Sequence, residues 1–283
     1  MAVRISVLMK EHRTIERLRA HFEIETELAA RLRNATKEQR TKLYSVVYDE
    51  LFRRVPDHPQ LTQKSSDGGL SRDISAQLET LRPLLRQDST FLEIGPGDCA
   101  LSFQIAKHVK QVYAVDVSDE ITKSSATPQN FKLALSDGCS IPVPDSSIDV
   151  AFSDQLMEHL HPDDAFEQLK NIHRALAPGG VYVCITPSRL DGPHDITKYF
   201  ESSARGFHLK EYTIEELNRL FKKVGFSKVR QSIGGKGKFV TIFVLPSIIC
   251  ERLLAIFPYG MRKFLAARVP FRTMLAIRIM GFK

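Results

Sequence analysis

A few residues in one short stretch have the types and spacing needed to hold a nucleoside. Glu93 precedes a Gly95-Pro96-Gly97 turn, and Asp116 follows about twenty residues later, at the end of a second apolar run. Glycines let a backbone turn approach a ligand closely, and a carboxylate at the end of the next strand accepts hydrogen bonds from ribose hydroxyls. The stretch therefore predicts a nucleoside-containing cofactor at the carboxyl edge of a parallel sheet.

The motifs around the turn bear on which cofactor it holds. Gly95-x-Gly97-x-x-Ala100 satisfies the dinucleotide-binding fingerprint in its permissive form, and Asp116 lies at a suitable distance from it. A dehydrogenase explains none of the later motifs, which follow in order at 135–139, 141–150, 153–160 and 173–180. Together with the acidic-x-Gly-x-Gly turn, these motifs resemble the class I S-adenosylmethionine-dependent methyltransferases over roughly residues 73–245.

The resemblance implies S-adenosylmethionine as the cofactor and S-adenosylhomocysteine as its product. Asp116 would hold the ribose, and Asp137 with the next backbone N–H would hold the adenine. Asp137 also sits in a Ser-Asp-Gly sequence that turn chemistry alone explains. Cys99 departs from the pattern, which has a third glycine there. The implied cofactor-binding residues are Glu93, Gly95, Gly97, Cys99, Asp116, Val117, Asp137, Gly138 and Ser153.

Methyl transfer to a hydroxyl or a protonated amine also requires a base, and histidine is the side chain suited to that task near neutral pH. His159 follows the fourth expected strand, and His194 with Asp195 lies in a loop after the fifth. We predict these three as catalytic residues. His159-x-His161 with Asp163 has metal-site spacing, but the sequence shows no convincing further ligand, so no metal is expected.

Acceptor specificity is expected in the insert at 187–212, which carries aromatic and histidine side chains. The predicted substrate-binding residues are His161, Tyr199, Phe207 and His208. The Asn/Asp-Pro-Pro-Tyr/Phe run of many amino-methylating nucleic acid enzymes is missing, which weakens a nucleic acid substrate. An enclosed aromatic pocket would favour a small acceptor, whereas a basic channel would favour RNA.

The elements that position these residues alternate between helix and strand patterns from about residue 73, as in a parallel α/β sheet. We expect a seven-stranded, Rossmann-like class I methyltransferase sheet, with strands at 90–94, 111–116, 130–135, 148–153, 180–186, 226–232 and 238–245. The domain would span 65–245. Residues 1–64 would form a helical cap on the core or a homodimerisation region, and a short helix would begin at Ser118.

Charge divides the chain unevenly. Residues 65–232 carry 18 Lys/Arg and 23 Asp/Glu, whereas residues 233–283 carry 9 and 1. A mildly acidic core argues against nucleic acid as the substrate. The basic, apolar segment 246–283 predicts amphipathic helices that pack on the core or bind an anionic membrane surface.

These features predict a cytoplasmic enzyme, peripheral at the inner face of the membrane if the 246–283 segment binds lipid. Four separated cysteines without a C-x-x-C pair fit a reducing compartment. The predicted activity is methyl transfer to a small-molecule, glycan or lipid-linked acceptor at oxygen, by in-line displacement with histidine-assisted deprotonation. The alternatives are an RNA or protein methyltransferase and a non-catalytic S-adenosylmethionine-binding scaffold.

Overall fold

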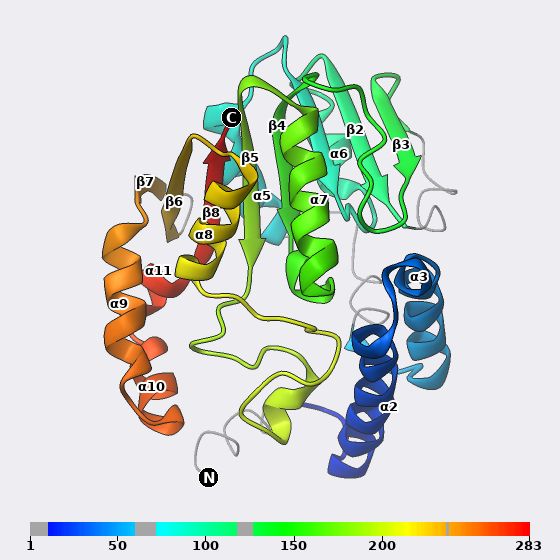
Figure 1. The fold of residues 1–283 in the computed structure, drawn as a ribbon, viewed down its shortest axis with the longest axis vertical. Helices are drawn as coiled ribbons and strands as arrows, with labels where there is room; N and C mark the ends of the chain where they lie inside the picture. The colour runs from blue at the N-terminus through cyan, green and yellow to red at the C-terminus, as the bar shows by residue number, and fades with distance from the viewer. Residues whose placement is uncertain (1–10, 60–71, 118–126, 236–237) are drawn as a thin grey trace.

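One mixed sheet forms the centre of the molecule (Figure 1). The computed structural model describes residues 11–59, 72–117, 127–235 and 238–283. The strands of the sheet run in the order β3-β2-β1-β4-β5-β8-β6-β7. Their bounds are β1 (Thr90–Ile94), β2 (Gln111–Asp116), β3 (Phe131–Leu135), β4 (Ile148–Asp154), β5 (Leu176–Thr186), β6 (Lys228–Gly235), β7 (Lys238–Phe243) and β8 (Ile277–Phe282).

The helices cover both faces of the sheet, because side chains alternate between the faces along each strand. Leu92 of β1 belongs to the same buried cluster as residues of α7 (Pro162–Ala175) and α8 (Ile214–Val224), whereas its neighbour Phe91 belongs to the cluster that includes α6 (Ala100–Ile105). Leu81, at the end of α5 (Arg72–Leu81), joins the Phe91 side, and η2 (Arg82–Leu84) follows it. The predicted α/β class is confirmed, with eight strands rather than seven.

The end of the chain differs from the helical tail that we expected. The helices α9 (Leu245–Ala255), α10 (Tyr259–Ala266) and α11 (Phe271–Leu275) do form, but β8 follows them and inserts between β5 and β6, antiparallel to both. Ile277 and Ile279 are buried on either side of the less buried Arg278, as in a strand, and Met280 is buried as well. A Cβ at Gly281 would meet the Phe221 ring at 2.5 Å, so this strand packs tightly against α8.

Two N-terminal helices, α2 (Ile15–Asn34) and α3 (Lys37–Arg54), lie at the carboxyl edge of the parallel strands (Figure 1). Leu28 and Leu32 of α2 and Leu51 of α3 belong to the same buried cluster as the central strands. The side chain of Arg40 makes a buried, two-pronged ion pair with Asp164 at the start of α7. We call α2, α3 and the 187–212 insert the acceptor cap.

Two sequence-based expectations fall outside the described residues. The predicted boundary between residues 64 and 65 lies in the 60–71 segment, and the helix predicted from Ser118 lies in the 118–126 segment. Within the described residues, no helix combines the length and the apolar character needed to cross a bilayer.

Candidate active site

The turn after β1 takes its shape from three residues with left-handed backbone conformations. The φ angles are +67° at Gly95, +56° at Gly97 and +58° at Cys99. A Cβ at Gly97 would meet no atom within 4 Å, so this glycine leaves the surface of the turn open. Cys99 is the N-cap of α6 and its side chain is fully buried. The left-handed φ at this position explains why the family pattern has glycine there.

A cavity of about 650 Å³ opens beside this turn and fits the predicted cofactor site. Glu93, Gly95 and Gly97 line it, as the sequence predicted. The Glu93 carboxylate accepts a hydrogen bond of 2.5 Å from the Ser102 hydroxyl, and burial raises the pKa of Glu93 to about 8. The full lining is Ile74, Ala76, Gln77, Thr80, Glu93, Gly95, Pro96, Gly97, Asp98, Leu101, Asp154, Gln155, Ile185, Phe239 and Arg278.

The predicted ribose and adenine residues lie at the ends of β2 and β3. Asp116 is the last residue of β2, and its Oδ1 accepts a hydrogen bond of 2.6 Å from the backbone of Val117. Asp137 Oδ1 accepts from the backbone N–H groups of Cys139 and Ser140, and these bonds hold the pKa of its carboxyl below the ordinary value despite partial burial. These contacts show turn chemistry at Asp137; its adenine role stays a prediction.

Two predicted cofactor contacts need correction. Ser153 is fully buried, and its hydroxyl bonds the Tyr182 hydroxyl at 2.7 Å, so it points into the sheet core. The next residues, Asp154 and Gln155, reach the cavity instead. Side-chain alternation along β4 accounts for this shift of one position. Gly138 donates its backbone N–H to Ser136 Oγ at 3.1 Å, so that group is already engaged.

The strand β8 supplies a cavity residue that the sequence analysis missed. Arg278 lines the cofactor cavity, and its Nη1 is buried and has no hydrogen-bond partner among the described residues. The sequence feature that could have indicated Arg278 is the alternation Ile277-Arg278-Ile279, within a segment that we assigned to helix.

The residues of this cavity suit S-adenosylmethionine. Arg278 Nη1, which has no hydrogen-bond partner among the described residues, can donate to the carboxylate of the methionine part, and Glu93 and Asp154 add acidic groups to the same lining. The open surface at Gly97 allows the close backbone approach that a bound nucleoside needs.

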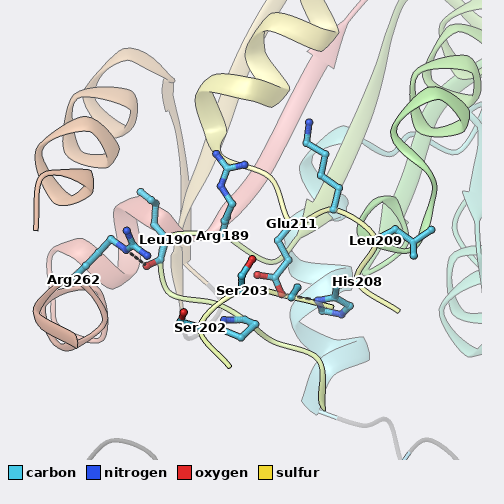
Figure 2. Close-up of a pocket in the computed structure, with 11 residues that line it drawn as sticks. Arg189, Leu190, Ser202, Ser203, His208, Leu209, Glu211 and Arg262 are labelled. Atoms are coloured by element: carbon cyan, nitrogen blue, oxygen red, sulfur yellow. Dashed lines mark hydrogen bonds and ion pairs between the residues drawn. The ribbon is translucent and has the colours of Figure 1, made fainter. Parts of the chain in front are cut away.

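A second cavity, of about 330 Å³, lies in the acceptor cap and is shown in Figure 2. Glu211 lines this cavity. Its Oε1 accepts hydrogen bonds from the backbone N–H of His194 and from His208 Nδ1, both at 2.7 Å. Arg189, Lys210 and Arg262 place positive charge around the lining. The other lining residues are Leu190, Pro193, Ser202, Ser203, Ala204, His208 and Leu209.

Two histidines meet a buried carboxylate between β4 and the insert. One ligand atom from each of Glu158, His159 and His208 lies within 4.8 Å of the others. The two imidazole rings are edge to face, with centroids 4.9 Å apart. Burial raises the pKa of Glu158 to about 7, and burial with the nearby His208 lowers the pKa of His159 to about 3. Burial opposes charge on His208, but the Glu211 carboxylate holds its pKa above the ordinary value. Sequence analysis named both histidines but missed Glu158 and Glu211.

Other predicted catalytic and substrate residues have structural contacts. Asp195 is buried and accepts from the backbone N–H groups of Thr197 and Gly206, which anchors the loop. His161 caps α7 by accepting from the Asp163 backbone at 3.3 Å. His194 Nε2 lies 3.1 Å from both Ser188 O and Asp191 Oδ1.

The two predicted aromatic substrate residues face the N-terminal segment. The Tyr199 hydroxyl donates to Glu11 at 2.8 Å, and Phe207 is buried against Tyr48, with ring centroids 4.8 Å apart. Of the four predicted substrate residues, only His208 lines the 330 Å³ cavity. His161 caps α7, whereas Tyr199 contacts a residue just before α2 and Phe207 contacts α3, both far away in the sequence.

Comparisons with known proteins agree with this geometry. A family model described as a methyltransferase domain matches residues 92–184. A probable S-adenosylmethionine-dependent methyltransferase of Mycolicibacterium smegmatis is 29% identical over 145 residues, covering 50% of this chain and 53% of the relative. An uncharacterized methyltransferase of Geobacillus kaustophilus is 31% identical over 146 residues, covering 48% of this chain and 68% of the relative.

A solved structure shows the fold likeness. The putative methyltransferase in a Haloferax volcanii complex with the Trm112 methyltransferase activator matches with a TM-score of 0.50 and 15% identity, over 74% of this chain and 88% of that one. The match spans only about half the length of the mycobacterial relative.

The strand order and the glycine turn at the sheet edge define a class I methyltransferase fold. The chain belongs to the S-adenosylmethionine-dependent methyltransferases, and S-adenosylmethionine is its cofactor.

Proposed function

We propose that the protein transfers a methyl group from S-adenosylmethionine to a hydroxyl oxygen of a lipid-linked acceptor. In this proposal the polar part of the acceptor enters the 330 Å³ cavity, and its apolar part stays at an anionic membrane surface. The observation that carries the proposal is the position of α10. Arg262 of this helix lines the cavity and donates to Leu190 O at 3.1 Å, while its neighbours Met261 and Phe264 are exposed apolar side chains.

The apolar exposure continues along α9 and β7. Leu245, Ile249, Leu253 and Ile256 are all more than half exposed, and Ile256 is 77% exposed. Their spacing puts them on one side of α9. The 233–283 segment that carries this surface has nine basic residues and a single acidic residue. Exposed apolar residues in a basic segment match the chemistry of an anionic lipid surface.

The bound cofactor supplies a methyl group already activated on a sulfonium. The chain's own residues have to align the acceptor and assist removal of its proton. His208 is suited to this task, because it lines the cavity and Glu211 holds its Nδ1. A carboxylate-held imidazole presents its other nitrogen as a proton acceptor.

A labelled-methyl assay tests the reaction. Purified protein and methyl-labelled S-adenosylmethionine would be incubated with separate lipid, water-soluble metabolite, RNA and protein fractions. We expect label in the lipid fraction, with mass spectrometry placing the added methyl on oxygen. Label in RNA or protein would replace this proposal with the corresponding alternative. Cofactor binding with no labelled product in any fraction would favour the scaffold interpretation.

Point variants test the membrane part, because deleting 246–283 would remove β8 from the sheet. The double variant Leu253→Asp/Ile256→Asp should bind phosphatidylglycerol-containing vesicles at least tenfold more weakly than the unmodified protein. Each change removes an apolar side chain worth about 1.5–3 kcal/mol when buried. Val46→Asp changes a residue of similar exposure on α3 and serves as the matched control. Equal vesicle binding by all three proteins would contradict the membrane part of the proposal.

A further inference from the structure

Histidine and carboxylate groups gather in two places in the described part of the chain. One cluster is His21, Glu25 and His58, and the other is Glu158, His159 and His208. In each cluster one ligand atom per residue lies within 4.8 Å of the other two. Distance alone therefore does not separate them, but the hydrogen bonds around the histidine rings do.

The first cluster lacks a suitable nitrogen on His21. Arg13 Nη1 lies 3.0 Å from His21 Nδ1, and a guanidinium can only donate, so Nδ1 uses its lone pair there. The proton of the neutral ring then sits on Nε2, which lies 2.8 Å from Glu25 Oε2 as an ion pair but makes no hydrogen bond of normal geometry within the described residues. Neither nitrogen of His21 has a lone pair left for a cation.

The second cluster has the opposite arrangement. His159 Nδ1 lies 3.1 Å from the carbonyl oxygen of Phe207, which can only accept, so Nδ1 carries the proton. His208 Nδ1 lies 2.7 Å from Glu211 Oε1 and is fixed in the same way. In both neutral rings the lone pair is therefore on Nε2. Metal-binding histidines are typically oriented by such contacts to a backbone carbonyl or a carboxylate.

The Glu158 carboxylate of the second cluster is also fixed in position, and one of its oxygens is left for a ligand. Thr186 Oγ1 donates to Glu158 Oε2 at 2.8 Å, which fixes the side chain. Glu158 is fully buried, and its Oε1 has no hydrogen-bond partner among the described residues. A buried carboxylate oxygen without a partner is costly unless a cation or a donor occupies the space beside it.

We propose that Glu158, His159 and His208 bind one divalent transition-metal ion, of the class represented by Zn²⁺. Two imidazoles and one carboxylate are a ligand set that Zn²⁺ and Fe²⁺ use, and three protein ligands leave a coordination position open. Glu211, Thr186 and the Phe207 carbonyl orient the ligands. The expectation of no metal rested on His161 and Asp163 as the available partners of His159. His161 instead caps α7, and the partner from the insert is His208.

The proposed metal site is inferred from these contacts alone and does not depend on the identity of the acceptor. If the ion is bound, the His208 lone pair is occupied, and an acceptor oxygen would be activated at the open metal position instead. The metal can therefore be tested without S-adenosylmethionine or an acceptor, so failure of the methyl-transfer proposal would leave this inference intact.

The test uses the full-length protein, stripped of metal with a chelator and titrated with Zn²⁺ by calorimetry and with Co²⁺ by visible absorption. We expect one ion per chain and a Co²⁺ spectrum without a thiolate charge-transfer band. His208→Ala and Glu158→Gln should weaken Zn²⁺ binding by at least tenfold. His58→Ala, from the first cluster, should leave it unchanged.

Absence of stoichiometric Zn²⁺ and Co²⁺ binding by the unmodified protein would overturn the inference, whatever the variants do. Weakening by His58→Ala in place of His208→Ala would also overturn it, because the ion would then lie in the first cluster. Circular dichroism would show which variants fold. If His208→Ala does not fold, His208→Gln would be used, and it should likewise weaken binding by at least tenfold.

Discussion

The cofactor turn and the acceptor cap lie on the same edge of the sheet, but different kinds of contact hold them. The turn is local. It follows β1 directly, and the left-handed conformations of Gly95, Gly97 and Cys99 shape it within five residues. The cap depends on distant partners. Phe207 donates its backbone N–H to Glu25, 182 residues earlier, and Arg33 donates to the Arg205 carbonyl, 172 residues later.

Because of this difference, we expect substitutions to affect the cofactor turn and the acceptor cap differently. A turn encoded by nearby residues can be kept while the surrounding segments change. A cap assembled from separate helices and an insert can be altered by a substitution in any of them. We therefore expect substitutions in the cap to change stability and acceptor binding more than the affinity for the cofactor.

The largest effect is expected at the ion pair that holds α3 against α7. Arg40→Ala should lower the free energy of unfolding by about 3–5 kcal/mol, because it leaves Asp164 buried without its cation. Urea denaturation would measure the change. Below the unfolding transition, the affinity for S-adenosylmethionine should stay within about twofold.

Arg31→Ala provides the control for this prediction. Arg31 pairs with Glu50 on the surface of the same two helices, and an exposed pair contributes about 0–1 kcal/mol. If Arg40→Ala lowered the free energy of unfolding no more than Arg31→Ala does, the stability of the cap would not depend on the buried ion pair. A large loss of cofactor affinity in folded Arg40→Ala would break the separation between the two regions.

The same difference explains what could be predicted from the sequence. The bounds of β1 and β2 agree with the prediction, because short apolar runs and a glycine turn encode them locally. Glu93, Gly95 and Gly97 line the cavity beside the turn for the same local reason, and their contact with the cofactor stays a prediction. The contacts of Phe207 and Tyr199 were missed, since the docking of α2, α3 and the residues before them determines what these side chains contact. The strand β8 was missed because its partners, β5 and β6, are distant in sequence and its basic segment resembled a helix.

The second prediction concerns the cofactor region and its dependence on pH. The ordinary pKa of a glutamate is 4.5, and burial raises the pKa of Glu93 to about 8. Between these values the folded protein keeps a proton that the unfolded chain has released, so stability falls as pH rises through this window. Relative to Glu93→Gln, the unmodified protein should lose roughly 3 kcal/mol between pH 5 and about 7.5, at about 1.4 kcal/mol per pH unit.

Parallel denaturation of both proteins across this pH range would isolate the contribution of Glu93, because the histidines that titrate there are common to both. Glutamine can still accept from Ser102, so the local hydrogen bond is kept. A stability difference that does not change with pH would show that Glu93 is ionised at neutral pH in the folded protein. The cofactor cavity would then carry an additional negative charge.

The smallest effect tests how local the cofactor turn is. At Cys99, with φ of +58°, glycine should give a protein about 1 kcal/mol more stable than alanine, because alanine keeps the left-handed strain. Both variants lose the same buried thiol, so comparing them removes that contribution. Ala100→Gly, one residue later at the start of α6, should show the opposite preference, with glycine about 0.5–1 kcal/mol less stable than the native alanine. Thermal denaturation of the three variants would measure both differences. If alanine were as stable as glycine at position 99, backbone strain would not explain the glycine of the family pattern, and the turn would depend on packing beneath it as the cap does.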